Sequence, residues 1–129
     1  MKEITLKKRL SSGEVEFIAL KHSESPPWKI TFQGSDYVAD DLFNSLLELR
    51  KELELKGECL LCNGSRKDCY PSGMSRQMSG GVVVYKYLIG RHVDPNETFN
   101  IFDETSYENL STVEEQKEYF YRWVKSEKK

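Results

Sequence analysis

The stretch LFNSLLELRKELELKG, residues 42–57, decides the fold class, because it predicts the clearest helix in the chain. Its apolar stripe consists of four leucines: Leu42, Leu46, Leu49 and Leu53. Residues spaced by three or four positions lie on one helical face. The first turns carry Asp40 and Asp41, and the last turns carry Arg50, Lys51 and Lys56, an order that matches the helix dipole. Gly57 suits the left-handed residue that ends a helix. We therefore predict a helix that packs its leucine stripe against a sheet.

Strand patterns before this helix predict an antiparallel arrangement. Residues 4–7 and 15–19 alternate in polarity, and the turn at Ser11–Gly13 between them indicates a hairpin. A third strand is expected over residues 28–33. One face of the second strand is formed by Val15, Phe17 and Ala19.

The chain after the helix predicts further strands and a second helix. Residues 59–62 are short and apolar, which we interpret as a buried strand. Residues 82–89 are rich in valine and tyrosine, which favours a strand, and a last strand is expected over residues 99–102. Ser111 and Glu114 have the spacing of a capping box, so we expect the final helix to begin there. Its buried side should carry Val113, Phe120, Trp123 and Val124.

The predicted order of elements is β-β-β-α-β-loop-β-β-α. This mixture defines an α+β domain with a mostly antiparallel sheet of about six strands, packed by two helices. No repeat or linker interrupts the chain, so residues 1–129 are expected to form a single domain. The charged tail 126–129 is expected to fray.

Composition and the first residues bear on the class of protein. Of 129 residues, 38% are hydrophobic and 31% are charged, as in ordinary globular domains. No apolar run approaches the ~20 residues of a membrane helix. The first ten residues lack the apolar core of a signal peptide. Three cysteines, an odd number, fit reduced thiols better than a disulfide framework, so we expect a cytoplasmic protein with no membrane partner.

The cysteines and histidines are too few and too scattered for a metal site or a catalytic triad. Cys59 and Cys62 have the C-x-x-C spacing of half a zinc site, but the second pair of ligands is missing. Cys69, His22 and His92 belong to no known catalytic signature. We therefore expect no metal, no cofactor and no enzymatic activity.

The polar segment 63–81 is long for a connection without structure of its own, and such connections are often functional. Ser72 is placed to cap a short helix over residues 73–79, which the following glycine pair would end. In that helix Met74 and Met78 share one face, which we expect to point inward.

Two arginines make this segment a candidate anion site. Arg66 precedes the short helix, and Arg76 is expected to face outward from it. A helix N-terminus beside arginines suits a phosphate, nucleotide or carboxylate, with Arg66, Ser72 and Arg76 as the binding residues. The alternative is that the arginines pair with Asp68 or with loop carbonyls and only hold the connection in place.

Charge is segregated along the chain. Residues 94–118 carry eight acids and one base, Lys117, which gives 1 − 8 = −7, and the remainder is −2 + 7 = +5. The acids are Asp94, Glu97, Asp103, Glu104, Glu108, Glu114, Glu115 and Glu118. Such a segment is either a solvated face or a surface that steers a positively charged partner. Basic residues form no stripe, so we expect no direct binding to nucleic acid.

The sequence LLCNGSRKDCYPSGMSRQMSGGVVVYKY, residues 60–87, resembles a group of small uncharacterised bacterial proteins. The shared positions are Cys62, Asn63, Gly64, Arg66, Tyr70 to Met74, Arg76, Met78, Gly80, Gly81 and Tyr85. The later Thr112–Gln116 is also similar. Such proteins are associated with orphan genes and with immunity proteins that neutralise polymorphic toxins of Rhs or contact-dependent systems. The resemblance implies no catalytic residue.

These observations favour a non-enzymatic cytosolic binding protein, and the resemblance suggests an immunity-type inhibitor of a toxin domain. Its acidic segment would cover a basic active-site cleft, and complementary charge would speed the encounter. Tyr107, Tyr119 and Tyr121 are candidate aromatic anchors at the interface. The alternative function is a small-anion binding module that uses the 63–81 segment.

Overall fold

The leucine stripe of α1 (Leu42–Leu55) lies at the centre of the fold, as its spacing predicts. In the computed structural model, which describes residues 1–129, none of the four leucines is more than 3% exposed. The Asp41 side chain caps the first turn by accepting a hydrogen bond from the Asn44 N–H at 2.7 Å. Gly57, with a φ of +74°, follows the last turn. Helix α1 therefore ends where the sequence signals indicate, but it begins only at Leu42, so Asp40 and Asp41 precede the helix rather than lying in its first turns.

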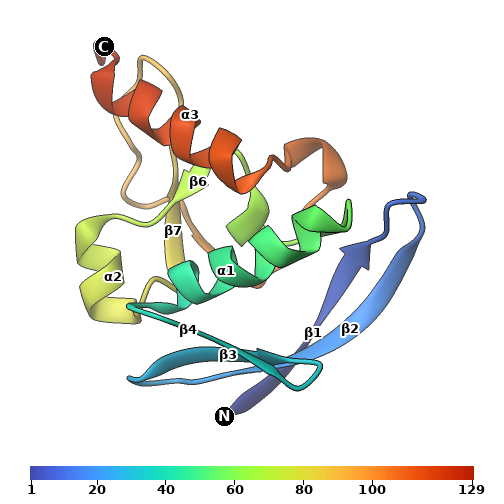
Figure 1. The fold of residues 1–129 in the computed structure, drawn as a ribbon. Helices are drawn as coiled ribbons and strands as arrows, with labels where there is room; N and C mark the ends of the chain where they lie inside the picture. Colours follow the sequence, from blue (N-terminus) through green and yellow to red (C-terminus); the bar gives the residue numbers. More distant parts are fainter.

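A five-stranded antiparallel sheet packs one face against α1 (Figure 1). Its strands are β1 (Lys2–Arg9), β2 (Val15–His22), β3 (Trp28–Phe32), β4 (Ser35–Ala39) and β5 (Cys59–Leu60). They lie in the order β4-β3-β2-β1-β5. The first four strands thus form a meander, and β5 pairs with the remaining edge of β1.

A second sheet, of three strands, is built from the chain that follows β5. It contains, in this order, β6 (Cys69–Tyr70), β7 (Val83–Lys86) and β8 (Thr98–Asn100). The helical segments of this half are the 3-10 turns η1 (Asn63–Ser65) and η2 (Tyr107–Asn109) and the helices α2 (Gly73–Ser79) and α3 (Val113–Lys125). Figure 1 shows α1 between the five-stranded sheet and α3.

Both sheets contribute to one hydrophobic core. A cluster of 15 buried residues runs from Leu6 and Ile30 in the first sheet, through Phe43 of α1, to Val84 in the second sheet. The chain is therefore a single α+β domain, which confirms the predicted class. None of its helices combines the length and the apolar content needed to cross a membrane.

Strands β4 and β6 are present in addition to the six predicted strands. The turn before β4 consists of only Gln33 and Gly34, since Phe32 pairs directly with Ser35. Both turn residues have positive φ, +49° and +79°, as a type I′ hairpin requires. Because glutamine is not a usual residue at such a turn, the hairpin signal in the sequence is weak. The predicted strand over residues 82–89 is shorter in the structure, because β7 ends at Lys86.

The face of β2 that carries Val15, Phe17 and Ala19 is the exposed face. Phe17 is 72% exposed, whereas Ile18 and Leu20 are buried against the core. Apolar residues occupy both faces of this strand, so its pattern does not tell which face the helix covers.

Helix α3 begins one residue later than predicted. Thr112 is the cap: its hydroxyl accepts a hydrogen bond from the Glu115 N–H at 3.1 Å, and the Glu115 carboxylate accepts one from the Thr112 N–H at 2.9 Å. The expected pair, Ser111 and Glu114, has the same spacing, so the motif fits both registers.

The buried side of α3 also differs from the prediction. Val113 is buried as expected, and Phe120 and Trp123 are half-buried, but Val124 is 49% exposed. The most buried residue of the helix is the polar Gln116, which has no exposed surface.

Candidate functional site

A buried arginine holds together the elements around the candidate sites. Arg50 of α1 is 3% exposed, and no carboxylate pairs with it. Its guanidinium donates to the Gly64 carbonyl at 3.0 Å, to the Gln116 side-chain oxygen at 2.6 Å and to the Ser111 carbonyl at 3.0 Å. Burial lowers the pKa of Arg50 from its usual value. Because a buried charge is costly unless its hydrogen bonds are satisfied, these acceptors fix the position of α1 relative to η1 and α3.

Gln116 of α3 completes this network from the other side. Its amide nitrogen donates to three main-chain carbonyls, those of Gly64 at 2.9 Å, Arg66 at 2.8 Å and Cys69 at 3.0 Å. The first part of the 63–81 segment is therefore pinned to α3. Every buried side-chain nitrogen or oxygen of the protein has a hydrogen-bond partner within the chain.

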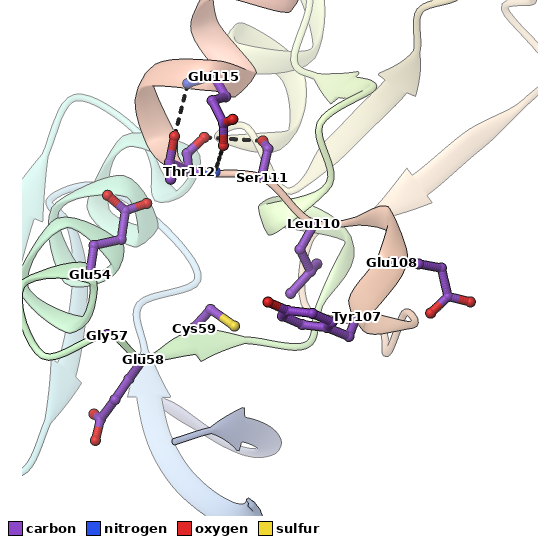
Figure 2. A pocket seen from close by; sticks show the side chains of 10 residues that line it. All are labelled: Glu54, Gly57, Glu58, Cys59, Tyr107, Glu108, Leu110, Ser111, Thr112 and Glu115. Atoms are coloured by element: carbon purple, nitrogen blue, oxygen red, sulfur yellow. Dashed lines mark hydrogen bonds between the residues drawn. The ribbon is translucent and has the colours of Figure 1, made fainter. Parts of the chain in front are cut away.

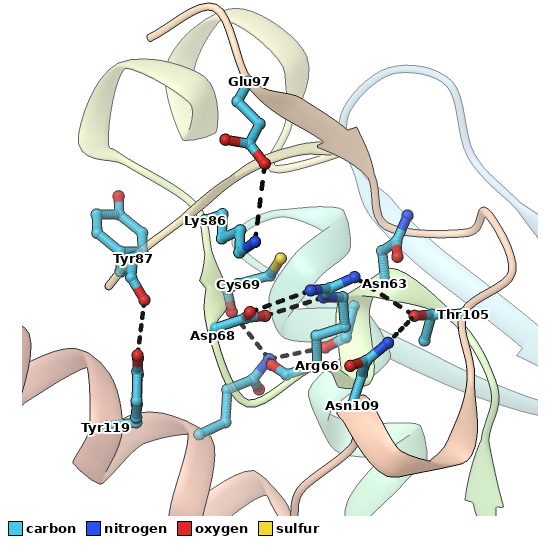
Figure 3. Close-up of polar contacts among 12 residues, drawn as sticks. Asn63, Arg66, Asp68, Cys69, Lys86, Tyr87, Glu97, Thr105, Asn109 and Tyr119 are labelled. Carbon is cyan, nitrogen blue, oxygen red and sulfur yellow. Dashed lines mark hydrogen bonds and ion pairs between the residues drawn. The ribbon is translucent and has the colours of Figure 1, made fainter. Parts of the chain in front are cut away.

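Arg66, the first candidate anion-binding residue, faces a carboxylate of its own segment. Its guanidinium donates two hydrogen bonds to Asp68, at 2.9 and 3.0 Å, as Figure 3 shows. It also lies 5.2 Å from the ring centre of Phe99. The hydrogen bond to Asp68 raises the pKa of Arg66. This is the pairing that the sequence left open as the structural alternative.

Arg76, the second candidate, does not face outward as predicted. Its guanidinium pairs with Asp41, the cap of α1, at 2.5 Å, and lies over the rings of Phe43 and Tyr70. The two arginines thus bind different carboxylates on different elements. The third candidate, Ser72, caps α2 as predicted, because its hydroxyl accepts a hydrogen bond from the Ser75 N–H at 3.0 Å.

The predicted inward face of α2 is wrong. Met74 and Met78 are 69% and 81% exposed, and Ser75 is buried instead. Contacts with the start of α1 set this orientation: Arg76 pairs with Asp41, and the Gly80 carbonyl accepts a hydrogen bond from the Leu42 N–H at 2.7 Å.

The three cysteines are free thiols in separate environments. Cys62 and Cys69 are buried, and Cys59 is half-buried. Burial raises the pKa of Cys62 and raises that of Cys69 to about 12, so both are protonated and weakly nucleophilic near neutral pH. No cluster of three or more His, Cys, Asp or Glu side chains is arranged to hold a metal ion.

All eight acids of the 94–118 segment are exposed. They are nevertheless spread over several elements. Glu97 lies 3.9 Å from Lys86, and Glu104 lies 3.1 Å from Lys7 in β1. Glu114 lines a groove of about 520 Å³ between α1 and α3. The remaining acids lie on loops, in η2 or on the exposed side of α3.

Two of these acids, Glu108 and Glu115, line a pocket of about 440 Å³ together with two further glutamates, Glu54 in the last turn of α1 and Glu58 just before β5. Figure 2 shows Glu54 and Tyr107 on opposite sides of this acidic pocket, with the Cys59 side chain between them.

The carboxylates of the acidic pocket differ in their contacts. Glu54 accepts a hydrogen bond from the Val113 N–H at 2.7 Å, and Glu58 pairs with the buried Lys8 at 3.2 Å. The hydrogen bond from the Thr112 N–H lowers the pKa of Glu115, which stabilises its charged form. Glu108 makes no ion pair or side-chain hydrogen bond.

Sequence reasoning found half of the acidic pocket. Glu108 and Glu115 belong to the acidic segment, but Glu54 and Glu58 follow the leucine stripe and gave no signal of their own. Only the turn at Gly57 and the docking of α3 bring them beside the acidic segment. Comparison with known protein families and with curated proteins finds no match to this chain.

Proposed function

We propose that this protein is a non-enzymatic cytosolic binding protein, an immunity-type inhibitor that covers the basic active site of a bacterial toxin domain with its acidic surface. One observation supports this above others: all eight acids of residues 94–118 are exposed, and two of them border a pocket with two further glutamates. A surface of this charge attracts a basic cleft and speeds its association.

The proposed contact centres on the acidic pocket. A lysine or arginine side chain of the toxin enters between Glu54 and Tyr107 and meets carboxylates on two sides. Tyr107, which is 52% exposed, serves as an aromatic anchor at this pocket, and Tyr121, 51% exposed, serves as one at the groove that Glu114 lines. Tyr119 has a structural role instead, because its hydroxyl donates to the Tyr87 carbonyl at 2.8 Å.

The first experiment is an affinity pull-down of the tagged protein from its native cells, followed by association kinetics with the partner that it identifies. The test variant combines Glu108→Lys, Glu114→Lys and Glu118→Lys. Glu115 is left unchanged, because its carboxylate caps α3. We expect association at low salt to slow at least tenfold, since the variant reverses three charges of the steering surface.

The matched control reverses three exposed acids elsewhere, Glu3, Glu14 and Glu24, and so changes the net charge equally. This control should associate at nearly the wild-type rate. If association slowed equally in both variants, net charge alone would explain the effect, and this would contradict the proposed acidic surface. A partner without a basic toxic domain would contradict the inhibitor function itself.

The alternative, a module that binds phosphate, nucleotide or carboxylate through Arg66, Ser72 and Arg76, makes a different prediction. An anion would have to replace Asp68 or Asp41 as the partner of these arginines. A ligand that binds the folded state raises its melting temperature. An unchanged melting temperature in phosphate, relative to chloride at equal ionic strength, would rule this module out for phosphate.

A further inference from the structure

Most of strand β2 has a partner strand on only one side. Strand β1 pairs with β2 along its full length, from Val15 to His22. Strand β3, on the other side, pairs only with Lys21 and His22. Figure 1 shows the β1–β2 hairpin extending beyond β3 and β4. Residues 15–20 therefore form a free sheet edge, which we call the β2 edge.

The hydrogen-bond pattern tells which main-chain groups this edge presents. On the β1 side, the Glu14 carbonyl accepts a bond from the Leu10 N–H, and on the β3 side the Ser23 N–H donates to the Lys29 carbonyl. Main-chain groups of successive residues alternate between the two sides of a strand. Even-numbered residues of β2 thus bond to β1, and the odd-numbered Val15, Phe17 and Ala19 direct their N–H and C=O groups outward.

The β2 edge lacks the features that protect most edge strands from pairing. It has no proline, and its only charged residue is Glu16, which is paired with Lys8 at 3.3 Å. Its outer face carries Phe17, 72% exposed, and Val15, 50% exposed. A sheet edge with free hydrogen-bonding groups and exposed apolar side chains is a template for another strand.

We propose that the β2 edge pairs antiparallel with the same edge of a second copy of this chain, centred on Phe17. The main-chain N–H and C=O groups that point away from β1 in one copy must hydrogen-bond to the same kind of groups in the other copy. Odd-numbered residues must therefore face odd-numbered residues. Lys21 is already paired with Thr31. A register centred on Phe17 uses all three free residues. Phe17 then faces Phe17 of the second copy, and Val15 of each copy faces Ala19 of the other.

In this register the β2 edge is complementary to itself, as the two-fold interface of a homodimer requires, and charge does not oppose the pairing. Each Glu16 faces Ile18 of the other copy rather than a second acid, and it pairs within its own chain with Lys8, which Glu58 shares. The two phenylalanines meet across the strands on the exposed face, where aromatic pairs stabilise sheets. The inference is independent of the proposed function, because the β2 edge contains none of the acids of residues 94–118.

The dimer is tested by sedimentation velocity over a hundredfold range of protein concentration. We expect the wild-type chain to shift from monomer to dimer as its concentration rises. Phe17→Lys places two like charges at the centre of the pair and should leave a monomer. Val38→Lys changes a similarly exposed apolar residue on β4, 59% exposed, and should keep the dimer. Circular dichroism confirms that the variants fold.

The register is tested by disulfide trapping. Residues that face each other in a hydrogen-bonded antiparallel pair have Cα atoms ~5.5 Å apart, which suits a disulfide. Phe17→Cys should therefore form a covalent dimer under mild oxidation, whereas Val38→Cys and the wild-type chain should not. A wild-type chain that stays monomeric at every concentration would overturn the proposal and leave the edge to a strand of a different protein. Equal trapping of Phe17→Cys and Val38→Cys would overturn the register.

Discussion

Arg50 carries a charge into the interior with only carbonyl and amide oxygens as its hydrogen-bond acceptors. Arg50→Met keeps much of the length of the side chain but leaves the Gln116 side-chain oxygen and the Ser111 carbonyl without a donor, whereas the Gly64 carbonyl still accepts from the Gln116 amide. We expect the free energy of unfolding to fall by about 3 kcal/mol, because unsatisfied buried polar groups are costly. Urea denaturation measures this loss. Arg122→Met on the exposed side of α3 is the control and should change stability by less than about 0.5 kcal/mol.

Two glycines of the α2 region should respond in opposite directions to alanine. A methyl group added at Gly73 would enter open space, so Gly73→Ala should stabilise the protein by about 0.5 kcal/mol. Gly80 has a left-handed φ of +65°, and a methyl group there would collide with the Trp28 ring. Gly80→Ala should therefore destabilise the protein by at least about 1–2 kcal/mol. Thermal unfolding measures both changes, and equal effects of the two would contradict the described geometry of α2.

At the level of elements, the pair Ser111 and Thr112 tests where α3 begins. Thr112→Ala removes the hydroxyl that accepts from the Glu115 N–H, and we expect it to cost about 1 kcal/mol. Ser111→Ala leaves the capping box intact and should cost less than about 0.5 kcal/mol. The reverse ranking would restore the register that the sequence motif first suggested. Urea denaturation of the two variants decides between the registers.

Elements were predictable from sequence where their signals are long. The leucine stripe spans most of α1, and Gly57 marks its end, so the C-terminal bound and the buried face follow from the pattern. Helix α2 has only seven residues, and its orientation depends on the contacts of Arg76 and Gly80 with the start of α1 rather than on its two methionines. Strand β6 has two residues and exists because β7 pairs with it, which no local pattern reveals.

For the whole molecule, the titrating groups predict a loss of stability in alkali. Burial and the hydrogen bond to Glu52 raise the pKa of Tyr37 to about 12, and burial raises the pKa values of Cys69 and Tyr87 to about 12. These groups ionise near 9–10 in an unfolded chain. Between pH about 9 and about 12 the folded state thus holds more protons than the unfolded chain. These groups contribute their full stabilisation below pH about 9, and the free energy of unfolding falls as pH rises toward 12.

Urea midpoints measured between pH about 8 and about 11 check this dependence. Cys69→Ala removes one of the buried titrating groups, so its stability should fall less steeply than that of the wild-type chain above pH about 9. A stability that stays flat over this range would contradict the raised pKa values. If the stability of Cys69→Ala fell with pH as steeply as that of the wild-type chain, Cys69 would not contribute to the loss of stability in alkali.

The candidate sites were predictable only in part, because they depend on contacts between distant segments. The acidic segment is visible in the sequence, and its acids are exposed as a charged surface should be. Arg50 resembled an ordinary base near a helix C-terminus, yet it is buried by η1 and α3. Arg76 resembled an outward-facing residue, yet Asp41 lies beside it, 35 positions earlier in the chain.

The bond between Arg50 and Gln116 joins residues 66 positions apart, and this has a consequence for the order of events during translation. The β1–β2 hairpin pairs residues close in sequence, so it can form while the chain is still being made. The interior cannot close at that stage, because Arg50 and the carbonyls of Gly64, Arg66 and Cys69 lack their partner until residue 116 has left the ribosome. The nascent protein therefore completes its fold only after its final helix emerges, and an unfinished chain remains recognisable to chaperones and proteases.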